Sequence, residues 1–338
     1  MVLKVGIIGA GGISHSHAPH WVTVGAEVSV YSEVGAESLA NEFGLSVASS
    51  LDDLFENVDV VDICTPTTTH AAIAVAAIEA GKHVLCEKPI GRTTAQANAV
   101  ADAAHKHGRQ AYPAHVVRFF PEYVALKSAV ERGQIGDIAV ARYSRGGEGA
   151  TSEWFFDDAL SGGIIIDQMI HDIDQARWIA GEVVRVFARQ NPPTVDGAVP
   201  RNVVAHVTLT HASGAISFIQ GVWGPRGMQF RTSFDVAGTD GTLRFDSTSP
   251  AASTVDENLT SVAIESSYLP PTSAEESPYL TQIREFAAAF EGGPPPRVTI
   301  EDGVLAVAIA EAARESIARG AAVEFDADAV LGSEGALA

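Results

Sequence analysis

An α/β fold with two domains is predicted by the order of the apolar patterns along the chain. In the first third, short β-branched runs alternate with helical patterns of ten or more residues, which is typical of βαβ units in a doubly wound parallel sheet. Beyond it, several strand-like runs follow one another without long helices between them, which indicates a largely antiparallel sheet in an α+β domain. The length of 338 residues suits two domains, since one domain averages about 150 residues. We expect them over residues 1–120 and 121–338.

The first domain is predicted element by element. Apolar, β-branched runs predict its strands, and Ala-rich or amphipathic stretches predict its helices. Three helices end at Gly44, Gly81 and Gly108, the residue type that best caps a helix carboxyl end. The expected strands are residues 2–8, 27–31, 58–64, 83–86 and 110–115, and the expected helices are residues 13–24, 33–43, 67–80 and 93–107.

The second domain begins with a helix, and its strands then come close together. Gly162 and Gly163 precede its second helix, and residues 247–277 are polar and irregular, which predicts a surface loop. The expected helices are residues 121–132, 164–179, 275–290 and 301–319, and the expected strands are residues 138–144, 183–189, 203–210, 215–222, 229–236 and 242–245. This close spacing predicts a largely antiparallel sheet.

Charge excludes two classes of partner. The chain has 22 Lys and Arg residues against 42 Asp and Glu residues, a formal net charge of -20. Nucleic acids and anionic membrane surfaces need clustered cations, so neither is expected. Cys64 and Cys86 lie in apolar runs and suit buried, reduced thiols. Residues 1–12 lack the pattern of a secretory leader, and the longest apolar stretch, residues 71–78, is too short for a membrane span. We expect a cytoplasmic protein.

A glycine-rich turn predicts a dinucleotide site. Gly9 and Gly11 stand between the first strand and the first helix, followed by Gly12 and Ile13. Gly9 permits the tight turn, and Gly11 lets the backbone approach a pyrophosphate at the amides of the helix N-terminus. Ser14 takes the third fingerprint position and is small enough for close packing. A plain tight turn is the alternative, but the strand–turn–helix context favours the nucleotide site.

The end of the second strand bears on the choice between NAD and NADP. Ser32 holds the position where an acidic residue would bind the ribose hydroxyls of NAD, and Glu33 follows it. Ser32 would tolerate a 2′-phosphate, but Glu33 is a carboxylate where an NADP enzyme usually offers Arg. Between Lys4 and Lys82 the sequence has no Lys or Arg to neutralise such a phosphate. NAD is therefore preferred, with NADP as the alternative.

Three further residues are candidates for chemistry. Lys88 follows the strand at residues 83–86, at the edge where open α/β sheets bind ligands, and can stabilise an alkoxide oxygen. Asp167 and His171 lie four residues apart on one helix face. Such a pair can be a helix-stabilising contact, a metal pair or an acid–base pair. Taken alone, it is best explained as a structural contact, as Lys88 alone is best explained as a surface lysine.

Taken together and in this order, the motifs resemble those of the Gfo/Idh/MocA oxidoreductases, the family of glucose-fructose oxidoreductase and inositol dehydrogenase. The resemblance spans nearly the whole chain. It rests on Gly9-Ala10-Gly11-Gly12-Ile13, Cys64-Thr65-Pro66-Thr67 with His70, Glu87-Lys88-Pro89, Arg118-Phe119, Gly162-Gly163 with Asp167 and His171, and Glu301-Asp302-Gly303.

The resemblance implies a Rossmann domain, a C-terminal domain whose open sheet mediates dimers or tetramers, and roles for individual residues. His171 takes the alcohol proton, Lys88 stabilises the developing alkoxide, and Asp167 orients the substrate hydroxyl. The peptide before Pro89 is expected to be cis. The implied cofactor-binding residues beyond the glycine turn are Ser32, Glu33, Thr65, Pro66, His70, Glu87 and Lys88. His115 and Arg118 are expected near the nicotinamide and are candidates for binding substrate, as Trp154 is from its aromatic ring. His115 departs from the residues most common at its position in the family.

Other candidates have simpler explanations. His15, His17 and His20 suggest a metal, but no carboxylate joins them in the sequence, so we expect no metal and a place at the cleft wall or helix surface. Trp154, with Phe155 and Phe156, can be core or a wall against a sugar ring, and core is the better interpretation.

The functional hypothesis is an NAD(P)-dependent oxidoreductase that interconverts a secondary alcohol and a ketone on a polyol, inositol or sugar. One alternative is a glycosidase or isomerase that oxidises its substrate transiently with NAD. A second alternative is a non-catalytic dinucleotide sensor, which would need no proton acceptor such as His171.

Overall fold

The computed structural model describes residues 2–249, 253–257 and 276–332, and it divides into two compact units. Unit 1 contains Met1–Phe119 and Glu276–Val304, and unit 2 contains Phe120–Glu275 and Leu305–Ala338. Residues 276–304 pack with unit 1, although they are expected in the second domain.

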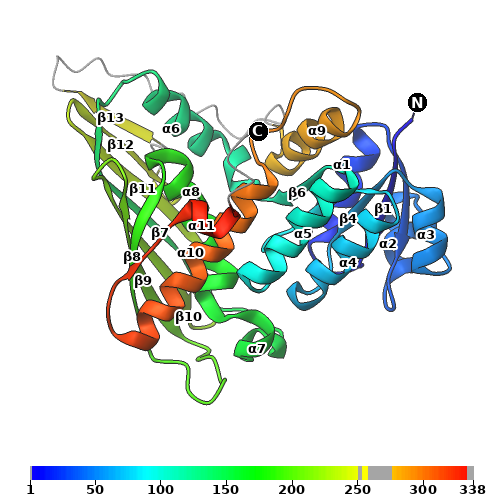
Figure 1. The fold of residues 1–338 in the computed structure, drawn as a ribbon, viewed down its shortest axis with the longest axis horizontal. Helices are drawn as coiled ribbons and strands as arrows, with labels where there is room; N and C mark the ends of the chain where they lie inside the picture. Colours follow the sequence, from blue (N-terminus) through cyan, green and yellow to red (C-terminus); the bar gives the residue numbers. More distant parts are fainter. Residues whose placement is uncertain (1, 250–252, 258–275, 333–338) are drawn as a thin grey trace. The chain divides into compact units, whose positions relative to one another are not determined.

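Unit 1 is built on a parallel sheet with the strand order β3-β2-β1-β4-β5-β6 (Figure 1). Neighbouring strands are parallel throughout the described part of this sheet, which confirms the predicted doubly wound arrangement. The order reverses beside β1, the switch point where such sheets bind ligands. The strands are β1 (Lys4–Ile8), β2 (Glu27–Tyr31), β3 (Ser46–Val47), β4 (Val60–Ile63), β5 (His83–Glu87) and β6 (Ala111–Ala114).

Six α-helices lie within unit 1 in the residues that are described, besides the 3-10 helix Val116–Phe119. They are α1 (Ser14–Thr23), α2 (Ala36–Phe43), α3 (Leu51–Asn57), α4 (Thr67–Glu79), α5 (Thr94–His107) and α9 (Pro278–Phe290). The sequence analysis missed β3 and α3, because two and seven residues are too few to show a hydrophobic period.

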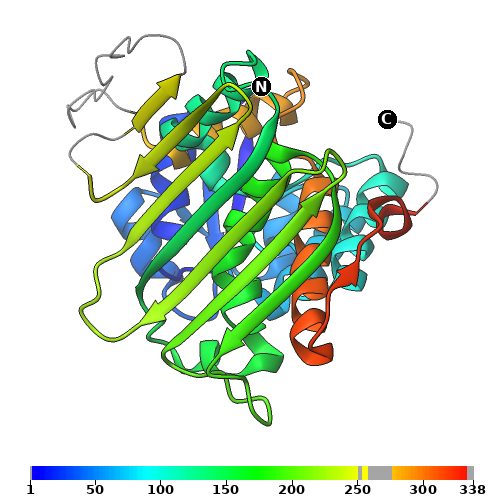
Figure 2. The same cartoon turned by 90° about the vertical axis from the view of Figure 1, so that its left-hand side faces the viewer.

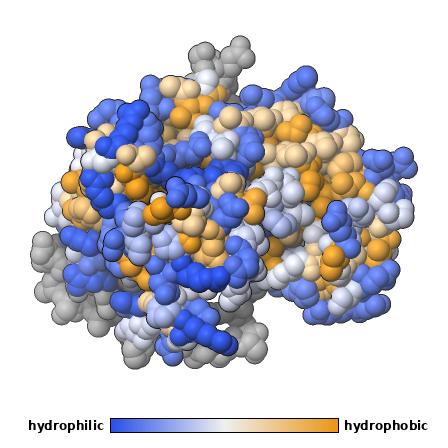
Figure 3. Space-filling model, turned by 90° about the horizontal axis from the view of Figure 1, so that it is seen from below, coloured by the Kyte–Doolittle hydropathy of each residue, from blue (hydrophilic) through white to orange (hydrophobic). Residues whose placement is uncertain are grey.

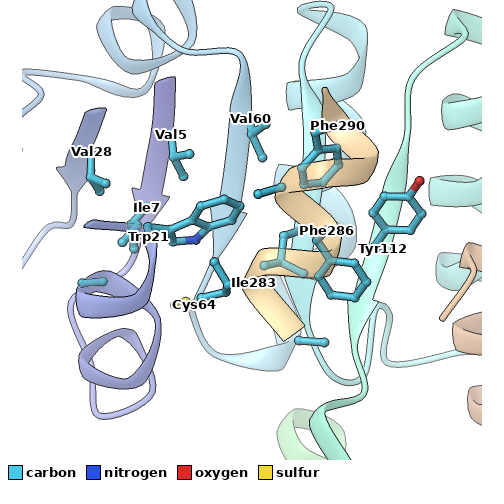
Figure 4. Packing of buried hydrophobic residues seen from close by; sticks show 14 of the residues in the cluster. Val5, Ile7, Trp21, Val28, Val60, Cys64, Tyr112, Ile283, Phe286 and Phe290 are labelled. Carbon is cyan, nitrogen blue, oxygen red and sulfur yellow. The ribbon is translucent and has the colours of Figure 1, made fainter. Parts of the chain in front are cut away.

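Aromatic packing explains why residues 276–304 join unit 1. Ile283, Phe286 and Phe290 of α9 enter the same core as Trp21 of α1 (Figure 4). Phe286 stacks on Tyr112 of β6 with ring centroids 5.1 Å apart. The distant segment thus buries its apolar face against the parallel sheet, a pairing that no local pattern in the chain reveals.

Unit 2 is built on a mixed sheet with the strand order β13-β12-β11-β7-β10-β9-β8-β14 in the described residues. β7 and β10 pair in parallel, and the other described pairs are antiparallel, which confirms the predicted mostly antiparallel sheet. The strands are β7 (Ile138–Glu148), β8 (Val183–Asn191), β9 (Val203–His211), β10 (Ile216–Gly224), β11 (Arg231–Gly238), β12 (Gly241–Asp246), β13 (Ser253–Glu257) and β14 (Val323–Glu324).

One face of this sheet is open, and helices lie behind the other. Figure 2 looks onto the open face, with α8 (Ile170–Ala180) and α10 (Ile300–Arg319) behind the strands. The remaining helices are α6 (Pro121–Glu131), α7 (Asp158–Ser161) and α11 (Ala327–Leu331). The loop expected over residues 247–277 is interrupted by β13, and its residues 250–252 and 258–275 lie outside the described structure.

Neither the helices nor the face in Figure 3 has the features of a membrane span in the described residues. Hydrophilic and hydrophobic residues are interspersed on the face shown in Figure 3. None of the helices within residues 2–249 and 276–332 has both the length and the hydropathy that crossing a bilayer demands.

Candidate active site

The glycine-rich turn has the shape that a pyrophosphate site needs. Gly9 follows β1 with φ of 106°, and a Cβ there would lie 2.7 Å from the Cys64 carbonyl oxygen. A Cβ at Gly11 or Gly12 would meet no atom within 4 Å, so this part of the turn borders open space. Ser14 donates from Oγ to the Gly11 carbonyl at 2.5 Å and ties the turn to α1. The turn therefore fits a dinucleotide phosphate at a helix N-terminus.

Ile13 stands at the start of α1, and Ser32 and Glu33 follow the end of β2. Ile13 is the half-buried N-cap of α1. Ser32 follows β2 and donates from Oγ to the Val34 carbonyl at 2.8 Å, so its hydroxyl takes part in its own turn. Glu33 is exposed. At the end of β2, the exposed carboxylate of Glu33 therefore stands next to the Ser32 hydroxyl, which already donates a hydrogen bond within its own turn.

The loop after β4 holds Thr65, Pro66 and His70. Thr65 is half-buried, and exposed Pro66 is the N-cap residue of α4. His70 is buried, with Nδ1 2.8 Å from the Pro89 carbonyl and Nε2 2.8 Å from the Thr65 carbonyl. Burial is the main cause that lowers the pKa of His70. Its ring therefore contacts backbone on both sides and lies beneath the Thr65 loop.

The Glu87-Lys88-Pro89 segment leaves the carboxyl end of β5, and its Lys88–Pro89 peptide is cis, as expected. Lys88 is half-buried. Glu87 is buried, and its Oε2 accepts a hydrogen bond from the Lys88 backbone N–H at 3.0 Å. Lys88 thus stands at the carboxyl edge of the parallel sheet, the edge where such sheets bind ligands. The buried Glu87 carboxylate holds the backbone N–H of Lys88.

His17 and Asp62 complete a polar cluster that the sequence analysis missed. His17 Nδ1 lies 2.8 Å from Asp62 Oδ2, and His17 Nε2 lies 3.2 Å from Glu87 Oε1. The Trp21 indole donates to the same Asp62 oxygen at 2.7 Å. The expectation that no carboxylate joins this histidine is therefore wrong, and His17 is fully buried rather than on a cleft wall. Asp62 and Glu87 each stand in an otherwise apolar strand of the sequence. These two residues could have indicated the cluster, because a buried charge needs a partner.

The charges of this cluster are coupled. Burial alone would lower the pKa of His17, but the charge of Asp62 and its hydrogen bond raise it well above the ordinary value. Burial alone would raise the pKa of Glu87, but the hydrogen bond and charge of His17 lower it. The cluster therefore holds an imidazolium between two carboxylates. His17, Asp62 and Cys64 are also close enough to hold a metal, but hydrogen bonds already account for their contacts.

In unit 2, Asp167 and His171 lie at a π-helical turn rather than on one straight α-helix. Ile165–Met169 forms the π-helical turn, and His171 follows in α8. Both side chains are half-buried. Such turns are rare and frequent at functional sites, because they redirect side chains relative to a regular helix.

Arg145 of β7 anchors the residue that follows each member of this pair. Its guanidinium donates to both Asp172 oxygens, at 2.8 and 3.1 Å, and its carbonyl accepts from Gln168 Nε2 at 2.9 Å. Asp172 is fully buried, and burial of Arg145 is outweighed by the charge of Asp172, which raises the pKa of Arg145. The helix that carries both candidates is thereby fixed to the sheet.

The residues implied to bind substrate differ in their surroundings. His115 and Arg118 are buried in unit 1. Arg118 donates to Asp302 at 2.9 Å and to the Arg297 carbonyl at 2.8 Å, so its guanidinium braces unit 1 internally.

Trp154, in unit 2, is half-buried and stacks on Phe155 with ring centroids 3.8 Å apart. Phe155 and Phe156 contact Trp223 edge to face. None of these three consecutive aromatic residues is fully buried, so their assignment to the core is wrong. They form an aromatic cluster with partly exposed rings.

Comparison with known families confirms the resemblance inferred from the motifs. Residues 3–115 match the family described as an oxidoreductase family with an NAD-binding Rossmann fold. Residues 123–244 match the GFO/IDH/MocA C-terminal domain. The first match covers the parallel sheet, and the second covers β7 to β11 and the first part of β12.

Individual relatives cover nearly the whole chain. An uncharacterized oxidoreductase, YrbE, from Bacillus subtilis is 30% identical, over 96% of this chain and 97% of its own. Myo-inositol 2-dehydrogenase from Thermotoga maritima is 28% identical, over 96% and 99%. The crystal structure of GenD2 from gentamicin A biosynthesis, in complex with NAD, has a TM-score of 0.82 at 27% identity, over 96% and 97% of the two chains.

Proposed function

Because the chain belongs to the Gfo/Idh/MocA oxidoreductase family, we propose that it is an NAD-dependent dehydrogenase that interconverts a secondary alcohol and a ketone on a polyol, inositol or sugar. The observation that carries the proposal is Lys88, anchored at the carboxyl edge of a parallel sheet that also presents an open glycine turn. The named activity of the Thermotoga relative and the NAD complex of GenD2 support the substrate class and the cofactor.

Three side chains have separate roles in this proposal. His171 accepts the proton of the substrate hydroxyl, Lys88 stabilises the developing alkoxide, and Asp167 orients the hydroxyl. Imidazole suits this task, because its ordinary pKa lies near neutral pH and permits proton transfer in either direction. Bound NAD supplies the acceptor for the hydride.

Cofactor binding is assigned to the glycine turn and the two loops beside it. Gly9, Gly11, Gly12 and Ile13 would hold the pyrophosphate, and exposed Glu33 would accept from the ribose hydroxyls. The preference for NAD over NADP rests on this carboxylate, which would repel a 2′-phosphate. The loops contribute Ser32, Thr65, Pro66, His70, Glu87 and Lys88, with His70 acting through the Thr65 carbonyl.

The proposal extends to assembly and location. Phe187 of β8 and Phe218 of β10 both pair in register with Thr208 of β9, so the three side chains share one sheet face. Both rings are more than a third exposed. We propose that this open face joins copies into a homodimer or homotetramer, which light scattering of Phe218→Glu would test by a loss of assembly. Buried, unpaired Cys64 and Cys86 support a cytoplasmic location.

Turnover of a polyol and sugar panel by Lys88→Ala and His171→Ala variants tests the function. We expect each to lower kcat about a hundredfold or more, which is about 2.7 kcal/mol of transition-state stabilisation. NADH binding, measured by nicotinamide fluorescence on cofactor-stripped protein, should persist and exceed NADPH binding. Lys82→Ala is the matched control, since Lys82 precedes β5 and donates to the Val58 carbonyl.

Three outcomes would contradict the proposal. Unchanged kcat in either variant would remove that residue's role. Tighter binding of NADPH would reverse the cofactor assignment. Substrate turnover without net NADH formation would favour the enzyme class that uses NAD transiently.

A further inference from the structure

His17 lies in the middle of a buried chain of hydrogen bonds, Asp62–His17–Glu87, which we call the relay. It comes from α1, whereas Asp62 belongs to β4 and Glu87 ends β5. All three are buried, with exposed fractions of 0%, 0% and 6%. Trp21, labelled in Figure 4, gives Asp62 a second donor from the same helix. The relay therefore ties α1 to two strands through charged hydrogen bonds.

The relay ends at the backbone of Lys88. Glu87 has two carboxylate oxygens with different partners: Oε1 faces His17 Nε2 at 3.2 Å, and Oε2 accepts from the Lys88 N–H at 3.0 Å. A carboxylate is flat and rigid, so fixing one oxygen fixes the other. The position of His17 thereby limits where the Lys88 backbone can lie.

From this geometry, we propose that His17 is a positioning residue that holds Lys88, through Glu87, in the conformation that the dehydrogenase reaction requires. This inference rests on the proposed function, since it presupposes that Lys88 acts on the substrate. His17 itself touches neither substrate nor cofactor in the proposal.

Fold stability alone does not require such a cluster. Burying an ionic group costs solvation energy, and replacing a buried ionic cluster by well-packed apolar residues is often neutral or stabilising. An imidazolium and two carboxylates leave one buried negative charge, a costly arrangement for a core that only needs to be filled. The cost is understandable if the cluster specifies one conformation of the segment that carries a cation, Lys88.

The other end of the segment is held as well. The Pro89 carbonyl lies 2.8 Å from His70 Nδ1, and His70 is buried against the Thr65 carbonyl. Lys88 is therefore flanked by one residue that His17 holds and one that His70 contacts. The Lys88 side chain itself is half-buried.

Two substitutions at position 17 separate the two contacts of the ring. The amide nitrogen of Asn lies near the place of Nδ1, and that of Gln lies near the place of Nε2. His17→Asn should keep the donor to Asp62 and lose the one to Glu87, and His17→Gln should do the reverse. Both remove the same charge and the same ring, and they differ in which contact the amide keeps: the one to Asp62 in His17→Asn and the one to Glu87, which leads to Lys88, in His17→Gln. His20→Gln, on the same helix but half-buried, is the control for helix α1.

The first measurement is hydrogen exchange of the Lys88 amide in the protein without cofactor. We expect His17→Asn to speed this exchange at least tenfold over His17→Gln and His20→Gln, while amides within β1 and β4 exchange alike in all three. The second is kcat per NADH-binding site, which should fall at least tenfold in His17→Asn and be largely retained in His17→Gln. If His17→Asn does not fold, Glu87→Gln replaces it, since one amide oxygen cannot accept from both His17 and the Lys88 N–H.

Equal exchange of the Lys88 amide and equal kcat in His17→Asn and His17→Gln would overturn the inference. Faster exchange in all strands alike would also overturn it, because that result marks a purely structural role. Lys88→Ala distinguishes a failure of the proposed function from a failure of the role of His17. If Lys88→Ala keeps full activity, the proposed function fails. If Lys88→Ala is inactive and His17→Asn is as active as His17→Gln, only the role of His17 fails.

Discussion

Asp62 in unit 1 and Asp172 in unit 2 are both fully buried, but the two carboxylates face different cations. Asp62 in unit 1 faces the imidazole of His17 and the indole of Trp21. Asp172 in unit 2 accepts hydrogen bonds from Nε and Nη2 of the Arg145 guanidinium. The first cluster contains a further carboxylate, Glu87, whereas the second is a balanced pair with bidentate geometry.

The charged clusters of the two units therefore respond differently to pH. A guanidinium stays charged at any pH a protein tolerates, so the Arg145–Asp172 pair is a permanent anchor. An imidazolium can lose its proton, so the Asp62–His17–Glu87 cluster is conditional on pH. The permanent pair holds the helix of Asp167 and His171, and the conditional cluster holds the backbone of Lys88.

The largest effect is expected from breaking the permanent pair. Arg145→Met would leave Asp172 buried without its cation, which costs about 3–5 kcal/mol. Urea unfolding followed by circular dichroism measures the loss. Arg145→Lys should recover part of it, because a lysine keeps the charge but not the two parallel hydrogen bonds. A loss below about 1 kcal/mol for Arg145→Met would show that Asp172 finds another partner.

A smaller, pH-dependent effect is expected for the conditional cluster. The folded pKa of His17 is raised above its ordinary value of 6.5, so the stabilisation that His17 contributes is fully present below pH 6.5. It is lost as pH rises through the folded pKa. The folded pKa of Glu87 is lowered instead, so its contribution is lost as pH falls through that value.

The stability difference between the wild type and His17→Gln should therefore shrink as pH rises from 6 toward 10, and the difference for Arg145→Met should stay flat. Thermal unfolding at several pH values measures both. A His17→Gln difference independent of pH would contradict the charge assigned to His17. The groups that face His17 are Asp62 of β4, Cys64 after β4, Glu87 of β5, His20 of α1 and Tyr279 of α9, whose ring centroid is 6.0 Å away.

The smallest effect is expected from an exposed pair of the same chemistry. Arg201 Nη2 donates to both Glu153 carboxylate oxygens, at 2.8 and 2.7 Å, but these side chains are 61% and 81% exposed. Solvent screens such a pair, so Arg201→Gln should change the free energy of unfolding by less than about 1 kcal/mol. A loss as large as that of Arg145→Met would show that burial is not what separates the pairs.

The sequence predicted most elements and the order of the motifs, because strand and helix periods and glycine turns are local properties. Lys88 could be placed at the carboxyl edge of the sheet from the strand pattern alone. The π-helical turn at Asp167 could not be predicted from the sequence, because residues 164–179 have an ordinary helical pattern. The extra residue per turn comes from packing. The assignment of α9 to unit 1 likewise depends on aromatic contacts with segments over 160 residues earlier.

The fold class, the family and the residue types at the candidate site can all be predicted from the sequence. The partners of the buried charges, in contrast, follow from the packing of helices against strands. His17 meets Asp62 and Glu87 across 45 and 70 residues of chain, and Arg145 meets Asp172 across 27. A buried carboxylate in a strand requires a donor, but hydrogen bonds need contact within about 3 Å and good alignment. Which donor satisfies that condition depends on how helices and strands pack, not on their order in the chain.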